Sequence, residues 1–183
     1  QRRLFRADER ALSREEYQQL LRTARAHRMH QLALIIETLG GTGIRVSELC
    51  AITVEAAQNK RADIHLKGKI RTILIPSKLS KKLTSYARAQ KITRGEIFLT
   101  AGGTSISRYK IWADMKKLAK LSGVAPSKVF PHNLRHLFAR VFYGIEKDIA
   151  KLADILGHSS IDTTRIYIIS TGTEHRRRME NMH

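Results

Sequence analysis

Residues 64–75 read IHLKGKIRTILI, and this stretch decides the fold class because its hydrophobic pattern differs from that of the rest of the chain. Before Gly68, Ile64 and Leu66 are two residues apart, and after it Ile73 and Ile75 are two residues apart, which is the period of a strand with one buried face. The stretch therefore predicts a β-hairpin with Lys67, Gly68 and Lys69 at its turn and a second strand that ends at Pro76.

The residues before the hairpin follow a helical period instead. Ser13 and Glu16 form an S-x-x-E capping box, and apolar residues follow them at helical spacing. Helices are expected over residues 13–26, over residues 30–39 with an end at Gly40-Gly41, and from near Arg45 to residue 52. A strand near residues 53–56 is expected to precede the hairpin and to complete a three-stranded sheet.

The residues after the hairpin are again mostly helical. Glycines and prolines punctuate the apolar runs there, as they do at the ends of helices. Helices are expected over residues 78–90, from near residue 111 to Gly123, and over residues 131–143, 147–156 and 160–168. The predicted fold class is therefore α+β, mostly helical, with one small antiparallel three-stranded sheet.

The composition indicates a folded, strongly basic domain. The chain has 183 residues with 34 Lys and Arg against 16 Asp and Glu, so its formal net charge is +18 and its pI is about 10.6. Hydrophobic residues make up 42% of the chain, which favours a packed core over a disordered basic tail. A compact domain of this charge favours a polyanionic partner, most simply nucleic acid. A basic solvated surface, as in a structural protein, is the alternative.

The same composition excludes several classes of protein. A single cysteine, Cys50, excludes a disulfide scaffold and a cysteine-based zinc finger. No run of 18 apolar residues predicts a membrane span, and no secretory signal opens the chain, so a cytoplasmic protein is expected. Because Gln1 is not a natural start, the chain is expected to be a domain of a longer protein.

Motifs for nucleotide or metal chemistry are missing from the sequence. No G-x-x-x-x-G-K-[ST] loop is present, and the glycine-dense stretch 40–43 has no lysine after it. The carboxylates are scattered, without a paired motif for two-metal chemistry. His27 and His30 are better explained as exposed histidines at a helix end than as metal ligands. Neither a metal nor a cofactor is therefore expected.

Basic and phenolic side chains remain as candidates for chemistry on a phosphate. Arginines can hold a phosphate and offset the charge of a pentavalent transition state. A histidine or lysine can move a proton, and a deprotonated tyrosine can act as the nucleophile. His132 and Arg135 lie three residues apart and so share one helix face. The full set comprises Arg45, Lys67, His132, Arg135, His158 and Tyr167.

Each of these residues also has an interpretation without chemistry. Arg45 fits a solvated helix start, and His132 fits the first turn of a helix. Tyr167, flanked by two isoleucines, fits a core aromatic, and Lys67 fits an ordinary hairpin lysine. On spacing and charge alone, plain DNA binding is favoured over phosphoryl transfer.

Three local strings resemble those of a known family. Residues 41–49 (GTGIRVSEL) resemble the first-arginine box of the tyrosine recombinases, the phage-integrase family. Residues 132–136 (HNLRH) are similar to the family's H-x-L-R-H box. Residues 156–159 (LGHS) and 163–167 (TTRIY) resemble the box that holds its last histidine and its tyrosine. The boxes have the right order and separation, and this combination is far more specific than any one of them.

The resemblance implies a fold, a reaction and a set of roles. Tyr167 would attack the scissile phosphate, form a 3′-phosphotyrosyl link and free a 5′-hydroxyl. Arg45 and Arg135 would hold the nonbridging oxygens, and His158 would add a hydrogen bond. His132 would assist proton transfer, with Tyr167 as its partner. The fold would be that of the family's catalytic domain, and neither metal nor ATP would be required.

The resemblance also assigns a general acid and an orienting carboxylate. Lys67 would protonate the leaving 5′-oxygen, and Glu48 would orient the site from behind Arg45. Family members often read G-K-G-x-K-x-R before the proline, and counting back from Pro76 shifts the register here by one residue, so Lys69 is the alternative acid. Leu137 replaces the usual Ser or Thr, for which only a packing effect is expected.

The remaining expectations concern DNA and other protomers. Residues 1–10 would be a linker from an N-terminal core-binding domain, and residues 11–183 would be the catalytic domain. Its tail, residues 168–183, would dock on a neighbouring protomer in a tetramer on paired double-stranded DNA sites, whereas the chain alone would be a monomer. Accessory DNA-bending or excision proteins would be further partners. The predicted phosphate contacts are Lys69, Arg71, Arg108 and Lys110.

The function predicted from the resemblance is site-specific DNA recombination, for integration and excision of a bacterial mobile element. Residues 149–178 look most like integrases of conjugative transposons. The protein would lie at the bacterial nucleoid. The alternatives are a type IB topoisomerase-like enzyme, a DNA-binding module without catalysis, and a basic structural protein.

Overall fold

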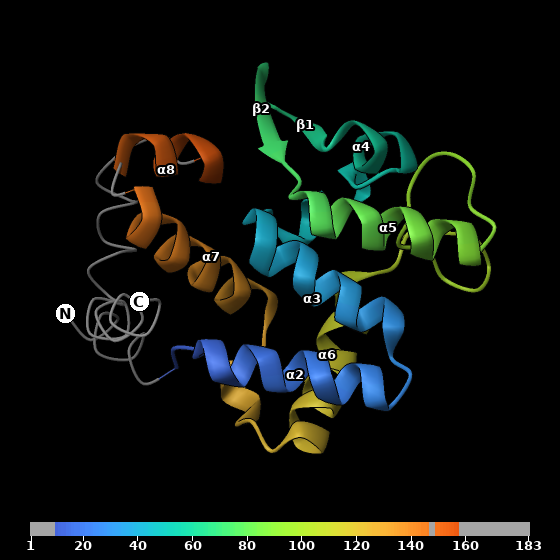
Figure 1. Cartoon of the computed structure of the whole chain (residues 1–183), viewed down its shortest axis with the longest axis vertical. Helices are drawn as coiled ribbons and strands as arrows, with labels where there is room; N and C mark the ends of the chain where they lie inside the picture. The colour runs from blue at the N-terminus through green and yellow to red at the C-terminus, as the bar shows by residue number, and fades with distance from the viewer. Residues whose placement is uncertain (1–9, 147–148, 158–183) are drawn as a thin grey trace.

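The structure is a computed structural model that describes residues 10–146 and 149–157 (Figure 1). The elements are, in chain order, α2 (Arg14–Ala26), α3 (His30–Thr42), η1 (Val46–Ala51), α4 (Val54–Asn59), β1 (Arg61–Leu66), β2 (Lys69–Leu74), α5 (Ser77–Ala89), α6 (Arg108–Ser122), η2 (Pro126–Lys128), α7 (Pro131–Glu146) and α8 (Ile149–Leu156). The mostly helical fold class with a small antiparallel sheet is confirmed. The helix predicted over residues 160–168 lies outside the described residues.

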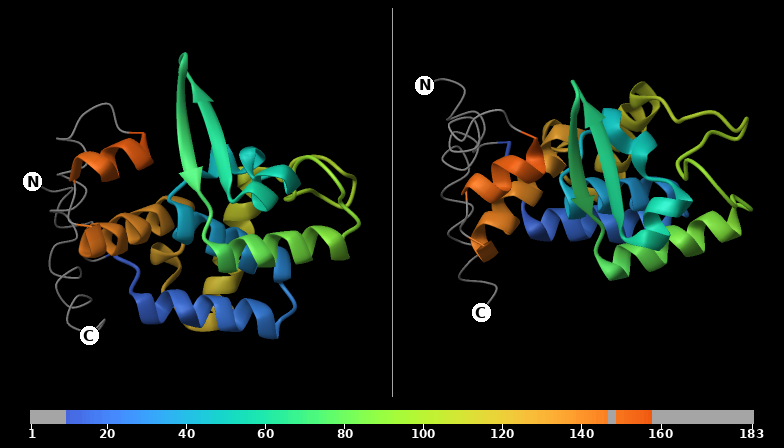
Figure 2. Two further views of the ribbon diagram at one scale, coloured as in Figure 1. Left: turned by 45° about the horizontal axis from the view of Figure 1, so that its top comes forward. Right: turned by 90° about the horizontal axis from the view of Figure 1, so that it is seen from above.

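The β-hairpin forms where its alternating pattern predicts it and projects from the helical body (Figure 2). Strand β1 pairs antiparallel with β2, with Arg61 opposite Leu74 and Leu66 opposite Lys69. The turn consists of Lys67 and Gly68, both at positive φ (49° and 76°), as a two-residue turn between twisted strands requires. Lys69, expected in the turn, is instead the first residue of β2.

The expected third strand near residues 53–56 is wrong. In the described part of the chain the sheet has two strands, and Thr53 makes only an isolated bridge with Glu96. The Thr53 hydroxyl accepts a hydrogen bond from the Ala56 N–H at 3.0 Å and so caps α4. The buried side chains of Val54 and Ala57 then hold this short helix on the core. A helix cap thus replaces the strand that the apolar residues suggested.

The predicted end of the second helix at Gly40-Gly41 is also wrong, because α3 continues through both glycines to Thr42. The left-handed residue that ends α3 is Gly43, with φ 74°, and its N–H bonds to Leu39 O at 3.1 Å. Gly40 is needed for a different reason, since a Cβ there would lie 2.9 Å from the Tyr17 ring. The helix expected from near Arg45 is present as the 3₁₀ helix η1.

Helix α3 is the centre of the domain, and α2, α5, α6 and α7 all pack against it (Figure 1). Its apolar residues are buried on every side, so it is covered by the apolar faces of its neighbours. Those faces supply Leu20, Leu83, Met115 and Leu134, each at most 1% exposed. The C-terminal end of this rigid helix carries the chain into Arg45.

Helix α7 is fastened to the start of the domain by buried polar side chains. The Asn133 amide donates to Arg10 O at 2.6 Å and to Lys128 O at 2.7 Å. The Arg140 guanidinium donates to Leu12 O at 2.6 Å. These bonds give the buried Asn133 and Arg140 side chains backbone acceptors and tie α7 to residues 10–12 and to the end of η2. Among the described helices, none is long and apolar enough to span a membrane.

We predict that Gly43→Ala destabilises the domain more than Gly123→Ala. Both glycines have nearly the same positive φ (74° and 75°), but a Cβ on Gly43 would overlap the Phe138 ring, whereas nothing lies within 4 Å of a Cβ on Gly123. Backbone strain alone costs about 1–2 kcal/mol, and overpacking at Gly43 adds about 1–3 kcal/mol. Urea unfolding of both variants measures the difference. Equal losses would show that Phe138 moves aside freely.

Candidate active site

Arg45 extends from the junction between α3 and η1. Gly43 turns the chain out of α3, Ile44 is fully buried, and Arg45 then adopts an extended backbone (φ −79°, ψ 152°) as the cap of η1. The Arg45 side chain remains 37% exposed. Its guanidinium is thus fixed at its base and open to solvent over part of its surface.

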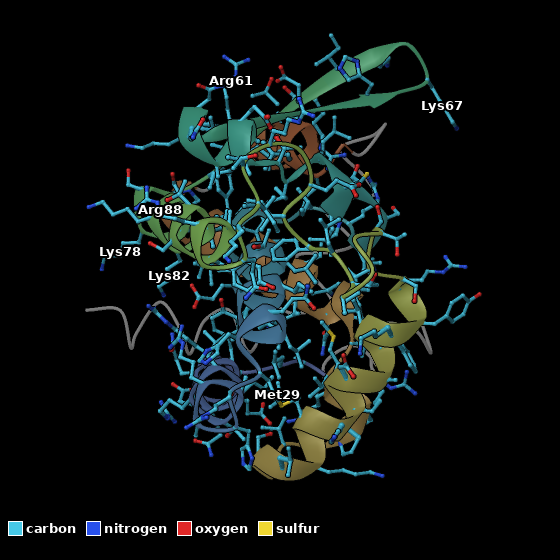
Figure 3. All side chains as sticks on the ribbon, turned by 90° about the vertical axis from the view of Figure 1, so that its right-hand side faces the viewer. Met29, Arg61, Lys67, Lys78, Lys82 and Arg88 are labelled. Carbon is cyan, nitrogen blue, oxygen red and sulfur yellow. The ribbon has the colours of Figure 1, made fainter. Side chains whose placement is uncertain are left out.

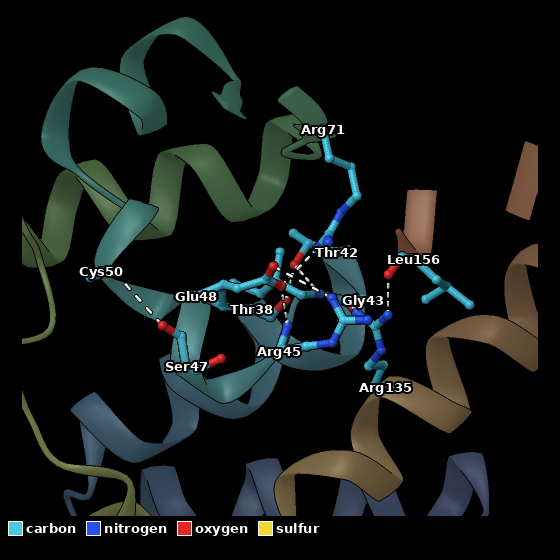
Figure 4. Close-up of polar contacts among 11 residues, drawn as sticks. Thr38, Thr42, Gly43, Arg45, Ser47, Glu48, Cys50, Arg71, Arg135 and Leu156 are labelled. Carbon is cyan, nitrogen blue, oxygen red and sulfur yellow. Dashed lines mark hydrogen bonds and ion pairs between the residues drawn. The ribbon is translucent and has the colours of Figure 1, made fainter. Parts of the chain in front are cut away.

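Glu48 lies behind Arg45 as a buried carboxylate with two arginine partners (Figure 4). Its Oε1 accepts from the Arg45 backbone N–H at 2.8 Å and from Arg71 Nη2 at 2.7 Å, and its Oε2 lies 3.6 Å from Arg45 Nη1. Burial by itself raises the pKa of Glu48, but the hydrogen bonds from Arg71 and Arg45 and the charges of both outweigh burial. The pKa of Glu48 therefore lies below its ordinary value.

Arg135 connects the ends of two helices from its position on α7. The residue is 2% exposed. Its Nη1 donates to the Gly43 carbonyl at the end of α3, and its Nη2 donates to the Leu156 carbonyl at the end of α8 (Figure 4). One buried guanidinium thus brings together the three segments that the sequence boxes identify.

His132 lies in the first turn of α7, one turn before Arg135, and is exposed at the surface. Its ring meets the His136 ring edge to face, with centroids 4.6 Å apart. Partial loss of hydration lowers the pKa of His132 below its ordinary value, and the positive charges of Arg135 and Arg45 lower it further. At neutral pH the imidazole is therefore uncharged and able to accept a proton.

The hairpin places its basic residues in different surroundings. Lys67 is exposed at the outer end of the hairpin (Figure 3). Lys69, Arg71 and Ile73 alternate along β2 and share one face, and Ile73 is fully buried. Arg71 accordingly points inward, where its side chain is 11% exposed and pairs with Glu48. Lys69 lies on the same inward-facing side but is exposed.

The predicted phosphate contacts Arg108 and Lys110 lie in the exposed first turn of α6. Arg108 lies over the Tyr109 ring, 5.3 Å from its centroid, and Lys110 Nζ lies 3.2 Å from the Asp114 carboxylate. Both side chains are therefore accessible to a partner, and whether they contact DNA stays a prediction.

The structure thus brings Arg45, Glu48, His132 and Arg135 together, whereas His158 and Tyr167 lie outside the described residues. Sequence reasoning missed the inward position of Arg71, although its place two residues before Ile73 predicts a shared face. The sequence held no signal for the carbonyl groups that Arg135 binds. Within residues 10–146 and 149–157, no three His, Cys, Asp or Glu side chains gather as metal ligands would.

A sequence model of the phage integrase family matches residues 10–174 of the chain. The chain belongs to the phage integrase family. The resemblance inferred from the three sequence boxes is therefore confirmed. The matched region contains every residue of the cluster around Glu48.

Curated relatives in the family include two tyrosine recombinases named XerA. The chain is 31% identical over 164 residues to the tyrosine recombinase XerA of Pyrococcus furiosus, covering 86% of this chain and 56% of that protein. It is 32% identical over 178 residues to XerA of Thermococcus kodakarensis, covering 93% of this chain and 61% of the relative. The chain thus spans less than two thirds of the length of these relatives.

Solved structures of the family share the fold. The crystal structure of XerA recombinase aligns with a TM-score of 0.77 at 27% identity, covering 94% of this chain and 62% of that one. The Tn1549 transposon integrase in complex with transposon right end DNA aligns with a TM-score of 0.69 at 21% identity, covering 93% and 65%. The expected similarity to transposon integrases is thus present at the level of the fold.

We predict that Glu48→Gln lowers the free energy of unfolding by about 2–3 kcal/mol at pH 7, because two arginines lose their buried carboxylate partner. The pKa of Glu48 is lower in the folded than in the unfolded chain. The contribution of ionised Glu48 to the free energy of unfolding is therefore complete above its ordinary pKa of 4.5. That contribution is lost as the pH falls below this value. Urea unfolding at pH 7 and pH 3.5 should show the wild type and the variant converging in acid. A difference that stays constant would contradict this explanation.

Proposed function

We propose that this chain is the catalytic domain of a site-specific DNA recombinase that cleaves and rejoins DNA strands through a 3′-phosphotyrosyl link on Tyr167. In this role it would integrate and excise a mobile DNA element. The observation that carries the proposal is the buried Arg135 guanidinium, bound to the carbonyls of Gly43 and Leu156. This contact holds Arg45, His132 and the residue pair before His158 in one place.

The chemistry is a pair of transesterifications. The Tyr167 phenolate oxygen bonds to phosphorus, the bond from phosphorus to the 5′-oxygen breaks, and the leaving oxygen takes a proton from Lys67 or Lys69. The phenol proton passes to a base, for which the uncharged His132 imidazole is suited. In the second step a 5′-hydroxyl attacks phosphorus and returns its proton to the lysine, while the bond from phosphorus to Tyr167 breaks and the phenol recovers its proton from His132. Atoms and charge balance without a co-reactant.

The arginines would stabilise the pentavalent phosphorus of both steps. Arg45 offers a partly exposed guanidinium that a phosphate can reach directly. Arg135 is 2% exposed, so contact with the phosphate requires neighbouring side chains to move aside as DNA binds. Glu48 would hold Arg45 from the protein side. His158 would add a hydrogen bond to a phosphate oxygen.

The proposed substrate is double-stranded DNA. Related structures with the same fold include the XerH site-specific recombinase bound to its difH substrate and a lambda integrase dimer bound to a COC′ core site. For this chain we propose phosphate contacts from Lys69, Arg108 and Lys110, whose side chains are exposed. A tetramer on paired sites, joined through residues 168–183, with accessory DNA-bending or excision proteins, completes the proposal.

The decisive test is covalent capture of DNA by Tyr167. Nicked duplexes that span each end of the element carrying the gene, labelled and incubated with the protein in EDTA, should yield a protein–DNA band on a denaturing gel. Cleavage next to the nick releases a short fragment, so the link cannot be reversed. Tyr167→Phe should abolish the band, because it lacks the attacking oxygen but keeps the aromatic ring.

Gel shifts on the same duplexes provide the control. Tyr167→Phe should bind the DNA with wild-type affinity. Good binding without a covalent band in the wild type would identify a DNA-binding module without catalysis and overturn the proposal. A band that requires Mg²⁺ would overturn metal-independent transesterification.

We predict that a substrate with sulfur at the scissile 5′ position identifies the general acid. A thiolate leaves without protonation, so the cleavage defect caused by a lost acid disappears with sulfur, whereas other defects persist. Lys67→Ala should slow cleavage of the oxygen substrate by about 100-fold or more and cleave the sulfur substrate at the wild-type rate. Lys69→Ala is the matched control. Rescue of Lys69→Ala instead of Lys67→Ala would assign the acid to Lys69.

A further inference from the structure

Arg71 occupies an interior position that a phosphate contact would not require. It lies on β2 opposite Ile64, on the face shared with the buried Ile73. Its side chain is only 11% exposed, whereas Arg61 on the paired strand is 57% exposed. An inward position of the hairpin is therefore occupied by a cation. Burial of a cation costs free energy unless it has hydrogen-bonding or charged partners.

The first partner of Arg71 is Glu48. Arg71 Nη2 donates to Glu48 Oε1 at 2.7 Å, and the same oxygen accepts the backbone N–H of Arg45. A single carboxylate oxygen thus joins β2 to the segment that carries Arg45. Displacement of the hairpin would break this contact. Of the two arginines that bind Glu48 in the described residues, only Arg45 would then remain.

The second neighbour of Arg71 is Gly157, the last described residue before His158 in the sequence. Gly157 has φ 73°, and a Cβ there would lie 2.5 Å from Arg71 Nη1 and 3.0 Å from its Cδ. The Gly157 backbone therefore packs directly on the guanidinium, with room for a hydrogen atom but not for a methyl group. The adjacent Leu156 carbonyl accepts from Arg135, so two arginines hold this turn from different elements.

We infer that Arg71 is a positioning residue that locks the Leu156–Gly157 turn, which leads into His158, against the segment of Arg45 and Glu48. The same contact couples the hairpin that carries Lys67 to both segments. Glu48 and Gly157 cover the Arg71 guanidinium, which makes it a structural link rather than a phosphate contact. The effect on DNA cleavage rests on the proposed function, whereas the coupling between segments does not.

Hydrogen–deuterium exchange tests the coupling without any DNA. In Arg71→Gln, amides of residues 149–157 should exchange about tenfold or more faster, including the Gly157 N–H, which bonds to Asp154 O at 3.1 Å. Arg61→Gln is the matched control, because it removes the same charge from the exposed side of the same hairpin. Unchanged exchange over residues 149–157 in Arg71→Gln would overturn the inference.

Single-turnover cleavage tests the consequence. At saturating DNA, Arg71→Gln should cleave about 100-fold more slowly, with the Kd for DNA within about twofold of wild type and an unchanged salt dependence. Arg71→Lys should remain impaired, because an ammonium keeps the charge but lacks the planar group that packs on Gly157. Normal cleavage at saturation with weaker binding and a salt slope reduced by about one would identify a phosphate contact and overturn the inference.

A pair of double variants keeps the test valid if Arg71→Gln folds poorly. Gly157→Ala places a methyl group against Arg71, so its effect on unfolding should be smaller in an Arg71→Lys background than in the wild type. Gly123→Ala, with no neighbour at its Cβ, should be additive with Arg71→Lys. Additivity at Gly157 would contradict the packing. A wild type without covalent capture but with these couplings would refute only the proposed function.

Discussion

Arg135 has a charged side chain buried at the junction of three segments, and the rest of the site depends on how that charge is satisfied. A buried guanidinium is tolerated only when its N–H groups find acceptors. Here the acceptors include main-chain carbonyls, those of Gly43 and Leu156, at the ends of α3 and α8. Backbone carbonyls at helix ends are otherwise without partners inside the helix, so the contact satisfies both sides. Because α7 is itself bound to the start of the domain through Asn133 and Arg140, the positions of all three segments follow from one another.

The second constraint on the site is its charge balance. Arg45, Arg71 and Arg135 converge on a region in which Glu48 is the carboxylate that pairs with two of them. Because one carboxylate cannot neutralise several arginines, the electrostatic potential around the partly exposed Arg45 is positive. Repulsion among these cations destabilises the domain to some extent, but the same arrangement places positive charge where an anion can bind before the anion arrives. The pKa of His132 is lowered first by partial burial and then by the neighbouring cations Arg135 and Arg45, because each of these disfavours its protonated form.

Local chemistry explains which elements could be predicted and which could not. The helix after Ser13 begins at its capping box, and the helix before Gly123 ends at a left-handed glycine, because both signals act within one turn of the chain. The strand expected near residues 53–56 fails because Thr53 can either extend a strand or cap a helix. Burial of the residues after it, which is a tertiary effect, selects the helix. The predicted end of α3 is wrong for a similar reason, since Gly40, Gly41 and Gly43 lie close together in the sequence. Only the tertiary structure shows that Gly40 packs against Tyr17 inside the helix and that Gly43, against Phe138, ends it.

For the candidate active site, the sequence by itself determined the family and the placement of Arg45, Lys67 and His132 at a helix start, a hairpin turn and the first turn of a helix. These properties depend on residue type and short-range spacing. Only the tertiary structure decided which groups share a partner: that Arg135 reaches two carbonyls, and that Arg71 turns inward to join Glu48 and Gly157. The reason is physical. Every residue has a backbone carbonyl, so the sequence does not mark which carbonyl a side chain will bind. The partners of a strand side chain likewise depend on which surface packs against that face of the strand.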